Sequence, residues 1–145
     1  MKELAELMEG DAEFDIISDI IKRCDLNFSK YLEDKSLLTP RIFQEKLPKI
    51  IKELKLDNPD INVRDPSNFL YLLILGVLIL RTGAKVPEIL KINIRKATNP
   101  KNDIYIFKEE DLKKYRENLL DDLSRKISSH KSGIINPVLE EIHKF

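Results

Sequence analysis

Cysteine and histidine are scarce in this 145-residue sequence. Cys24 is the only cysteine, so no disulfide can form within the chain. The two histidines, His130 and His143, are distant from Cys24 along the chain, and we expect no metal site and no cofactor. Gly-rich phosphate loops, nucleophile elbows, HExxH motifs and CxxC motifs are also missing. These absences favour a protein that is not an enzyme.

A hydrophobic run long enough to cross a membrane is missing too. The longest apolar run covers the twelve residues 69–80 and is followed at once by Arg81, whereas a spanning helix needs about 20 apolar residues. The first residues, "MKELAELMEGDAEFD", have alternating charges and no hydrophobic region of the kind found in signal peptides. We therefore expect a soluble, cytoplasmic protein, and we interpret the apolar run as a buried core helix.

Net charge is zero, but the charges are unevenly distributed along the chain. Residues 1–37 contain ten acids and five bases, whereas residues 38–107 contain twelve bases and seven acids. Residues 81–101 contain six basic residues and only one acidic residue, Glu88. The basic middle of the chain can bind phosphates, or it can pair with the acidic N-terminal segment inside one fold. By length we expect a single domain, residues 1–145, with an acidic arm over 1–13 that can be flexible.

The order of capping residues predicts a mainly helical protein. A stripe of apolar residues over 12–24 predicts an amphipathic helix. Thr39 followed by Pro40 is a helix start, and Pro48 then predicts either two short helices or one kinked helix over 40–56. The apolar stripe of "EEDLKKYRENLLDDLSRKISSH" predicts a long helix that ends at Gly133, and "PVLEEIHKF" predicts a short closing helix.

The apolar run has its own start and stop signals. Asp65 followed by Pro66 marks a helix start, and Gly83 is suited to a left-handed C-cap, so we expect a helix over 66–82 that is buried on all sides. Pro87 opens a further helix. The alternation around Ile92 and the later "IYIF" leave open one small β-hairpin near 92–107. The predicted fold is all-α, a compact bundle of five to seven helices around the helix 66–82.

The end of the predicted core helix presents cations beside a new helix start. Arg81 and Lys85 lie next to the free backbone N–H groups expected near Pro87, an arrangement that suits phosphate. The alternative is that these cations only stabilise the C-terminal end of the outgoing helix. The sequence leaves both interpretations open.

The segment "RKISSH" resembles the ribonuclease motif of the HEPN family, in which an arginine and a histidine lie on one helix. That resemblance would make His130 a general base and Arg125 a stabiliser of the phosphorane. However, a separation of five residues places the two side chains about 140° apart around an ideal helix. We therefore favour a surface histidine at a basic helix end.

A longer segment resembles the start of the tyrosine-recombinase catalytic domain. In "RDPSNFLYLLILGVLILRTGAKVPEILKINI" an apolar helix ends in Thr82 and Gly83, and Glu88 and "IYIF" follow. Lys85 occupies the place of the catalytic arginine, and neither the His-x-x-Arg box nor a terminal nucleophilic tyrosine follows. An active recombinase is therefore excluded.

More of the chain resembles the small helical subunit of type III-A CRISPR effector complexes. The similar order runs from "LLTPRIFQEKLPKIIKEL" through "FLYLLILGVLILRTGAKVPEIL" to "FKEEDLKKYRENLLDDLSRKISSHK". The resemblance implies a non-catalytic antiviral-defence subunit, packed with other subunits, that holds RNA or a guide–target duplex by its phosphates. RNA is favoured over DNA. The candidate nucleic-acid-binding residues are Arg41, Arg81, Lys85, Lys91, Arg95, Lys96, Arg125 and Lys126.

The alternative is a helical assembly subunit without direct nucleic-acid contact. A nucleic-acid surface predicts that Arg81, Lys85, Arg95, Arg125 and Lys126 converge on one face. An assembly subunit predicts that these cations scatter or pair internally, and that an exposed apolar patch forms the interface. Both alternatives imply a multimer or one part of a hetero-complex.

Overall fold

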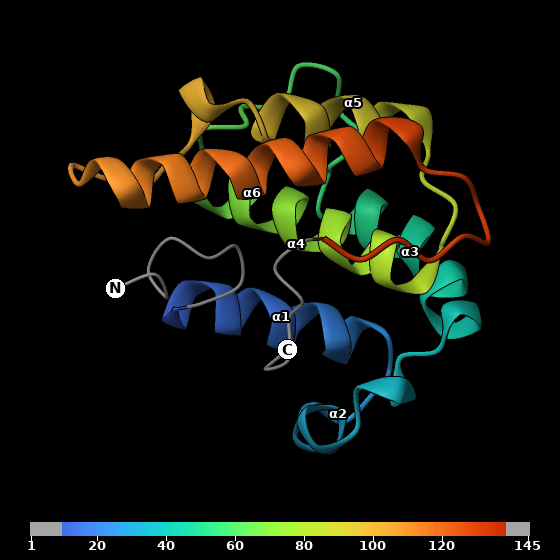
Figure 1. Cartoon of the computed structure of the whole chain (residues 1–145). Coiled ribbons are helices and arrows are strands. Elements are labelled where there is room, and N and C mark those ends of the chain that lie inside the picture. Colours follow the sequence, from blue (N-terminus) through green and yellow to red (C-terminus); the bar gives the residue numbers. More distant parts are fainter. Residues whose placement is uncertain (1–9, 139–145) are drawn as a thin grey trace.

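The computed structural model describes residues 10–138, and these residues form an all-α fold (Figure 1). No strand is present between residues 10 and 138, and no helix there is long and apolar enough to cross a membrane. The helices are α1 (Asp11–Arg23), α2 (Phe28–Glu33), η2 (Lys35–Leu37), α3 (Pro40–Glu53), α4 (Pro66–Thr82), α5 (Glu88–Ala97), η3 (Pro100–Asn102) and α6 (Glu110–Ser129), of which η2 and η3 are single 3₁₀ turns.

Helix α4 begins and ends where its capping residues predict. The Asp65 carboxylate accepts hydrogen bonds from the backbone N–H groups of Ser67 and Asn68, and Pro66 occupies the first helical position. Gly83 ends the helix with φ 77° and ψ 17°, a left-handed conformation that costs a glycine little. Local sequence rules are therefore sufficient to define the central helix.

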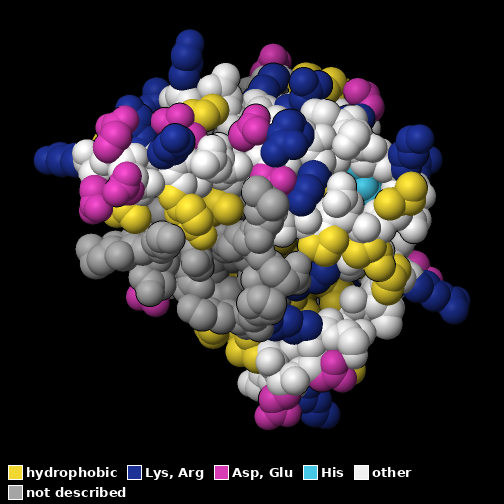
Figure 2. Space-filling model, in the orientation of Figure 1, with side chains coloured by type: hydrophobic (Ala, Val, Ile, Leu, Met, Phe, Trp, Pro, Cys, Tyr) yellow, Lys and Arg dark blue, Asp and Glu magenta, His cyan; other side chains and the backbone are white. Residues whose placement is uncertain are grey.

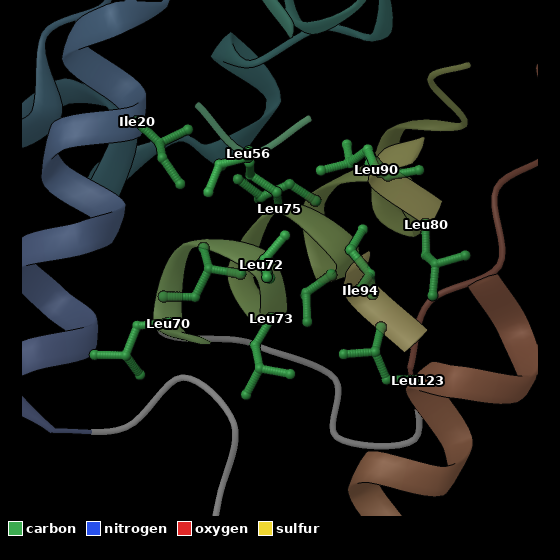
Figure 3. Close-up of a cluster of buried hydrophobic side chains, with 14 of the residues drawn as sticks. Ile20, Leu56, Leu70, Leu72, Leu73, Leu75, Leu80, Leu90, Ile94 and Leu123 are labelled. Atoms are coloured by element: carbon green, nitrogen blue, oxygen red, sulfur yellow. The ribbon is translucent and has the colours of Figure 1, made fainter. Parts of the chain in front are cut away.

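Helix α4 is buried around its whole circumference. Every residue from Leu72 to Leu80 is buried, and Figure 3 shows these side chains pointing in several directions. They meet Ile20 of α1, Leu56 beyond α3, Leu90 and Ile94 of α5, and Leu123 of α6. Burying each leucine or isoleucine contributes roughly 1.5–3 kcal/mol, so this helix organises the hydrophobic core. Helices α5 and α6 lie on one side of it, and α1 and α2 on the opposite side (Figure 1).

Residues 131–138, which we call the strap, return from α6 to the C-terminal end of α4. The Gly133 N–H donates to the Gly83 carbonyl at 2.7 Å, and the Asn136 N–H donates to the Leu80 carbonyl at 2.9 Å. Carbonyl groups in the last turn of a helix have no partner within the helix. The strap supplies a partner for one of them, Leu80, and for the C-cap residue Gly83, and so completes the end of the core helix.

The structure decides two alternatives that the sequence left open and adds one short helix. The small β-hairpin that the sequence left open near 92–107 does not form, because α5 continues to Ala97 and residues 103–107 pair with no strand. The buried positions of α5 have helical spacing, so the alternation around Ile92 does not reflect a strand. Helix α3 is a single helix that contains Pro48, and α2 was not predicted.

Expectations for the two ends of the chain are only partly covered by the described residues. Helix α6 ends at Ser129 with His130 as its C-cap, four residues before the expected Gly133. Residues 11–13 belong to α1, which shortens the expected flexible arm, and residues 1–9 lie outside the described part. The closing helix expected in "PVLEEIHKF" falls almost entirely on residues 139–145, which are also outside it. Cys24 is buried, and burial raises the pKa of its thiol to about 11.

Two glycines with positive φ give a matched test of the strap. A Cβ on Gly83 would lie 3.2 Å from the Gly133 carbonyl carbon, whereas a Cβ on Gly133 would have no neighbour within 4 Å. Gly133→Ala carries only the backbone penalty, about 1–2 kcal/mol. Gly83→Ala carries that penalty and displaces the strap, so we expect a loss of about 1 kcal/mol more. Urea unfolding measures both; equal losses would mean that the strap contact contributes nothing.

Candidate nucleic-acid interface

The structure distributes the predicted cations over two ends of the bundle. One end contains the start of α3, the end of α4, the end of α6 and the strap (Figure 1). The other contains the start of α4, η3 and the start of α6. Arg41, Arg81 and Lys85 belong to the first end, and α5 carries Lys91, Arg95 and Lys96 from one end toward the other. The eight candidates therefore do not form one compact site.

Three of the predicted cations are held by contacts within the fold. The Arg81 guanidinium donates to the Tyr31 hydroxyl at 2.8 Å, and burial raises the pKa of that tyrosine. The Lys96 ammonium donates to the Pro59 carbonyl at 2.9 Å and so fixes the loop between α3 and α4. Lys126 donates to the Pro137 carbonyl at 2.7 Å and fixes the strap. Each contact gives the cation a structural role.

Arg125 and His130 are directed to different partners. Arg125 forms an ion pair with Asp121 at 2.8 Å and approaches the buried Asp122 at 3.7 Å. The His130 ring lies over the end of α4, where its Nε2 is 2.7 Å from the Ala84 carbonyl and must donate to it. Arg125 and His130 therefore each make a structural contact. The "RKISSH" segment has a role in the fold that does not depend on any ribonuclease activity.

Arg41 and Lys85 are exposed at the end of α4. The Arg41 side chain is 88% exposed and lies 3.5 Å from Glu45, a contact that contributes little. The Lys85 backbone N–H donates to the Gln44 side chain, which holds the loop against α3 while the ammonium remains exposed. A groove of about 330 Å³ lies beside them, lined by Arg41, Gly83, Gly133 and Ile135 among others.

The outward side of α5 is a second exposed cationic surface. Leu90, Asn93, Ile94 and Ala97 face the core. Arg95 is exposed on the outward side of the helix together with Glu88 and Ile92, and Lys91 is half-buried at the edge of that side. Neither Lys91 nor Arg95 makes an ion pair with any residue between 10 and 138. We call these two residues the α5 basic face. Figure 2 shows Lys and Arg side chains interspersed with Asp and Glu over this part of the molecule. The positive charge is therefore confined to small areas and does not cover a whole face.

A cleft near η3 was not predicted from the sequence. It has a volume of about 510 Å³ and lies between the start of α4, η3, the segment 103–107 and the start of α6. We call it the Tyr105 cleft. Its lining residues are Arg64, Pro66, Pro100, Lys101, Asp103, Ile104, Tyr105, Ile106, Phe107, Lys113, Arg116 and Glu117. Arg64, Lys101 and Lys113 are exposed and make no ion pair within the described part of the chain.

A buried polar network stabilises the lining of the Tyr105 cleft. Arg116 is only 2% exposed and contacts both carboxylate oxygens of Asp103, at 2.8 and 3.1 Å. Its guanidinium carbon lies 5.3 Å from the centre of the Tyr105 ring and 6.0 Å from that of Phe69. The Tyr105 hydroxyl donates to the Glu13 carboxylate, and burial, followed by that hydrogen bond, raises the pKa of Tyr105.

The sequence contained a signal for this network. Arg116 follows Leu112 by four residues and precedes Leu119 by three, so it lies on the apolar stripe of the last helix. A charged residue at such a position needs a buried partner. The sequence does not say which acid provides it, because Asp103 lies in an irregular segment.

Comparison with known proteins gives no match: no protein-family model, no curated protein and no solved structure is similar to this chain. The charges and contacts described above therefore carry the functional proposal. Among them, Arg95 of the α5 basic face and three cations of the Tyr105 cleft are exposed and make no ion pair between residues 10 and 138.

Loss of one partner from the buried pair should be costly. Arg116→Met keeps most of the side-chain volume but leaves Asp103 charged and buried, so we expect a loss of about 3–5 kcal/mol in the free energy of unfolding. Adding Asp103→Asn removes the charge and keeps an oxygen for the Tyr105 N–H, and should recover part of the loss. Urea unfolding of the single and double variants measures the coupling; additive losses would contradict a buried ion pair.

Proposed function

We propose that the protein is a non-catalytic nucleic-acid-binding subunit that holds a phosphate backbone, with RNA favoured over DNA. The observation that carries the proposal is a set of exposed cations without ion pairs to any residue between 10 and 138. The set that lies on adjoining elements consists of Arg95 and the half-buried Lys91 on α5 and of Arg64, Lys101 and Lys113 at the Tyr105 cleft. Lys22 and Lys85 are also exposed without ion pairs in the described part, but they lie elsewhere. Helix α5 packs against both η3 and α6, so the two surfaces adjoin.

Unpaired cations on adjoining elements repel one another and add nothing to folding. A phosphate backbone neutralises such cations and releases its own counterions, which gives a favourable, sequence-independent contribution to binding. Arg81, Arg125 and Lys126 differ, because their contacts within the fold already explain them. We therefore assign phosphate contacts to the first group and structural roles to the second.

The proposed setting is a multi-subunit nucleoprotein complex. The order of motifs resembles the small helical subunit of type III-A CRISPR effector complexes, which supports repeated packing of such subunits along RNA. Phosphate contacts from helix surfaces suit this role, since A-form duplexes are recognised through shape and backbone. A binding unit of this kind needs no catalytic group.

Binding to labelled RNA over a salt series tests the proposal. Fluorescence anisotropy with single- and double-stranded RNA and DNA should show affinity that falls log-linearly with salt concentration. Lys91→Glu/Arg95→Glu should weaken RNA binding about tenfold or more and reduce the salt slope by about two contacts. Arg95 is exposed and Lys91 is half-buried, and neither makes an ion pair in the described part of the chain, so the fold should be unchanged, as circular dichroism can verify.

A matched control has the same charge change elsewhere. Lys22→Glu/Lys30→Glu replaces exposed lysines of α1 and α2, which lie on the opposite side of α4 from α5 (Figure 1). We expect this control to bind RNA nearly as the wild type does. Absence of salt-dependent binding in the wild type, or equal loss in both double variants, would refute the proposed surface.

A second candidate function is protein assembly without nucleic acid. It is favoured by the internal contacts of Arg81, Arg125 and Lys126, as expected for an assembly subunit. It is also favoured by Ile134 and Ile135 of the strap, whose exposed fractions are 53% and 58%. Ile135 also lines a groove of about 290 Å³ with Leu38 and Pro40. This candidate predicts self-association that Ile134→Ser/Ile135→Ser abolishes, as measured by analytical ultracentrifugation. A monomeric wild type would count against self-association through the strap.

A further inference from the structure

The Tyr105 cleft combines two kinds of lining that meet at one place. Arg64, Lys101 and Lys113 supply positive charge from three different elements, and Tyr105 and Phe107 supply aromatic rings. Its volume of about 510 Å³ falls within the range of roughly 300–1,000 Å³ that small-molecule sites occupy. Cations next to aromatic rings are the combination by which proteins bind single-stranded nucleic acid.

The charge balance of the cleft favours an anion. Arg116 neutralises Asp103 through its paired contacts, so neither contributes much net charge. Among the described lining residues, Glu117 is then the one acid opposed to three cations. A phosphate group near these cations would be attracted, and its contacts would be charge-assisted.

The second half of the segment 104–107 presents apolar surface at the cleft, whereas Ile104 and Tyr105 pack against the core. Ile106 is 88% exposed, an unusual position for so large an apolar side chain. Phe107 lines the cleft but is not part of the hydrophobic core or of the shell packed on it. The half-buried Phe107 thus contributes a ring to the lining of the cleft. Tyr105 is held by Glu13 and Arg116, so one aromatic wall is already ordered before binding.

We propose that the Tyr105 cleft binds one nucleotide, with its phosphate near Arg64, Lys101 and Lys113 and its base against Phe107 and Tyr105. This inference rests on the proposed function and narrows it, because a base can enter the cleft only when it is unstacked. Bases within a duplex are not accessible in this way. The α5 basic face then serves any phosphate backbone, whereas the cleft selects single strands.

Phe107→Ala separates base stacking from charge. It leaves every cation in place and removes one ring, so we expect the affinity for a labelled eight-nucleotide single-stranded RNA to fall about tenfold. The affinity for a duplex RNA should stay within a factor of two, on the order of experimental error. Phe28→Ala is the matched control, since it removes a half-buried phenyl ring from α2 on the opposite side of α4.

Titration with AMP distinguishes a free nucleotide from one that is part of a strand. Amide NMR shifts for residues 101–107 should move on addition of AMP, and inorganic phosphate alone should move them less. Millimolar AMP affinity beside micromolar RNA affinity, on the order of 10⁻³ and 10⁻⁶ M, supports a nucleotide within a strand. Tight AMP binding with weak RNA binding supports a free nucleotide.

The inference and the proposed function fail in different ways. If Phe107→Ala binds single-stranded RNA like the wild type while Lys91→Glu/Arg95→Glu does not, the nucleotide pocket is refuted and the backbone-binding function stands. If no RNA binds the wild type, the proposed function is refuted. If, in addition, AMP leaves the resonances of residues 101–107 unchanged, the nucleotide pocket is refuted as well.

Discussion

Burial of α4 on every side is the constraint on which the rest of the structure depends. A helix without a polar face must be surrounded, so α1, α5 and α6 pack directly on it and the remaining elements close the shell. Its two ends, however, must emerge at the surface, where Asp65 caps one and the strap caps the other. The cations of the chain are thereby divided between two ends of one bundle, and each end can have a separate role.

The two ends differ in how their charges are used. At the end of α4, Arg81 and Lys126 hold Tyr31 and the strap, and His130 binds a backbone carbonyl. Near the start of α4, one arginine, Arg116, is buried with Asp103 as its partner, and three exposed cations surround the cleft above it. A buried ion pair that stabilises the fold therefore lies next to exposed cations that can bind a ligand. A rigid buried pair beneath exposed cations is a favourable base for binding, because little must be ordered when a ligand arrives.

Local chemistry explains which parts of the fold could be predicted. Proline after an N-cap residue and glycine at a left-handed C-cap act within a few residues, and they defined α4 and the start of α3 correctly. The apolar alternation around Ile92 suggested a strand, although the segment is helical. Isoleucines on both sides of a short helix produce the same alternating sequence pattern as a strand. The candidate site was harder to predict from the sequence. Arg81 contacts Tyr31, which is 50 residues away in the chain, and Tyr105 contacts Glu13, which is 92 residues away. Such contacts depend on tertiary packing, so the sequence could not separate structural cations from available ones.

Photocrosslinking would show whether RNA lies along α5 and the Tyr105 cleft, as we propose. A single-stranded RNA with 4-thiouridine at each position would be crosslinked to the full chain, and the modified peptides identified by mass spectrometry. Crosslinks should concentrate in residues 88–117, with Tyr105 or Phe107 among the modified side chains. Crosslinks confined to the strap and the start of α3, at the other end of the bundle, would refute this placement of the RNA.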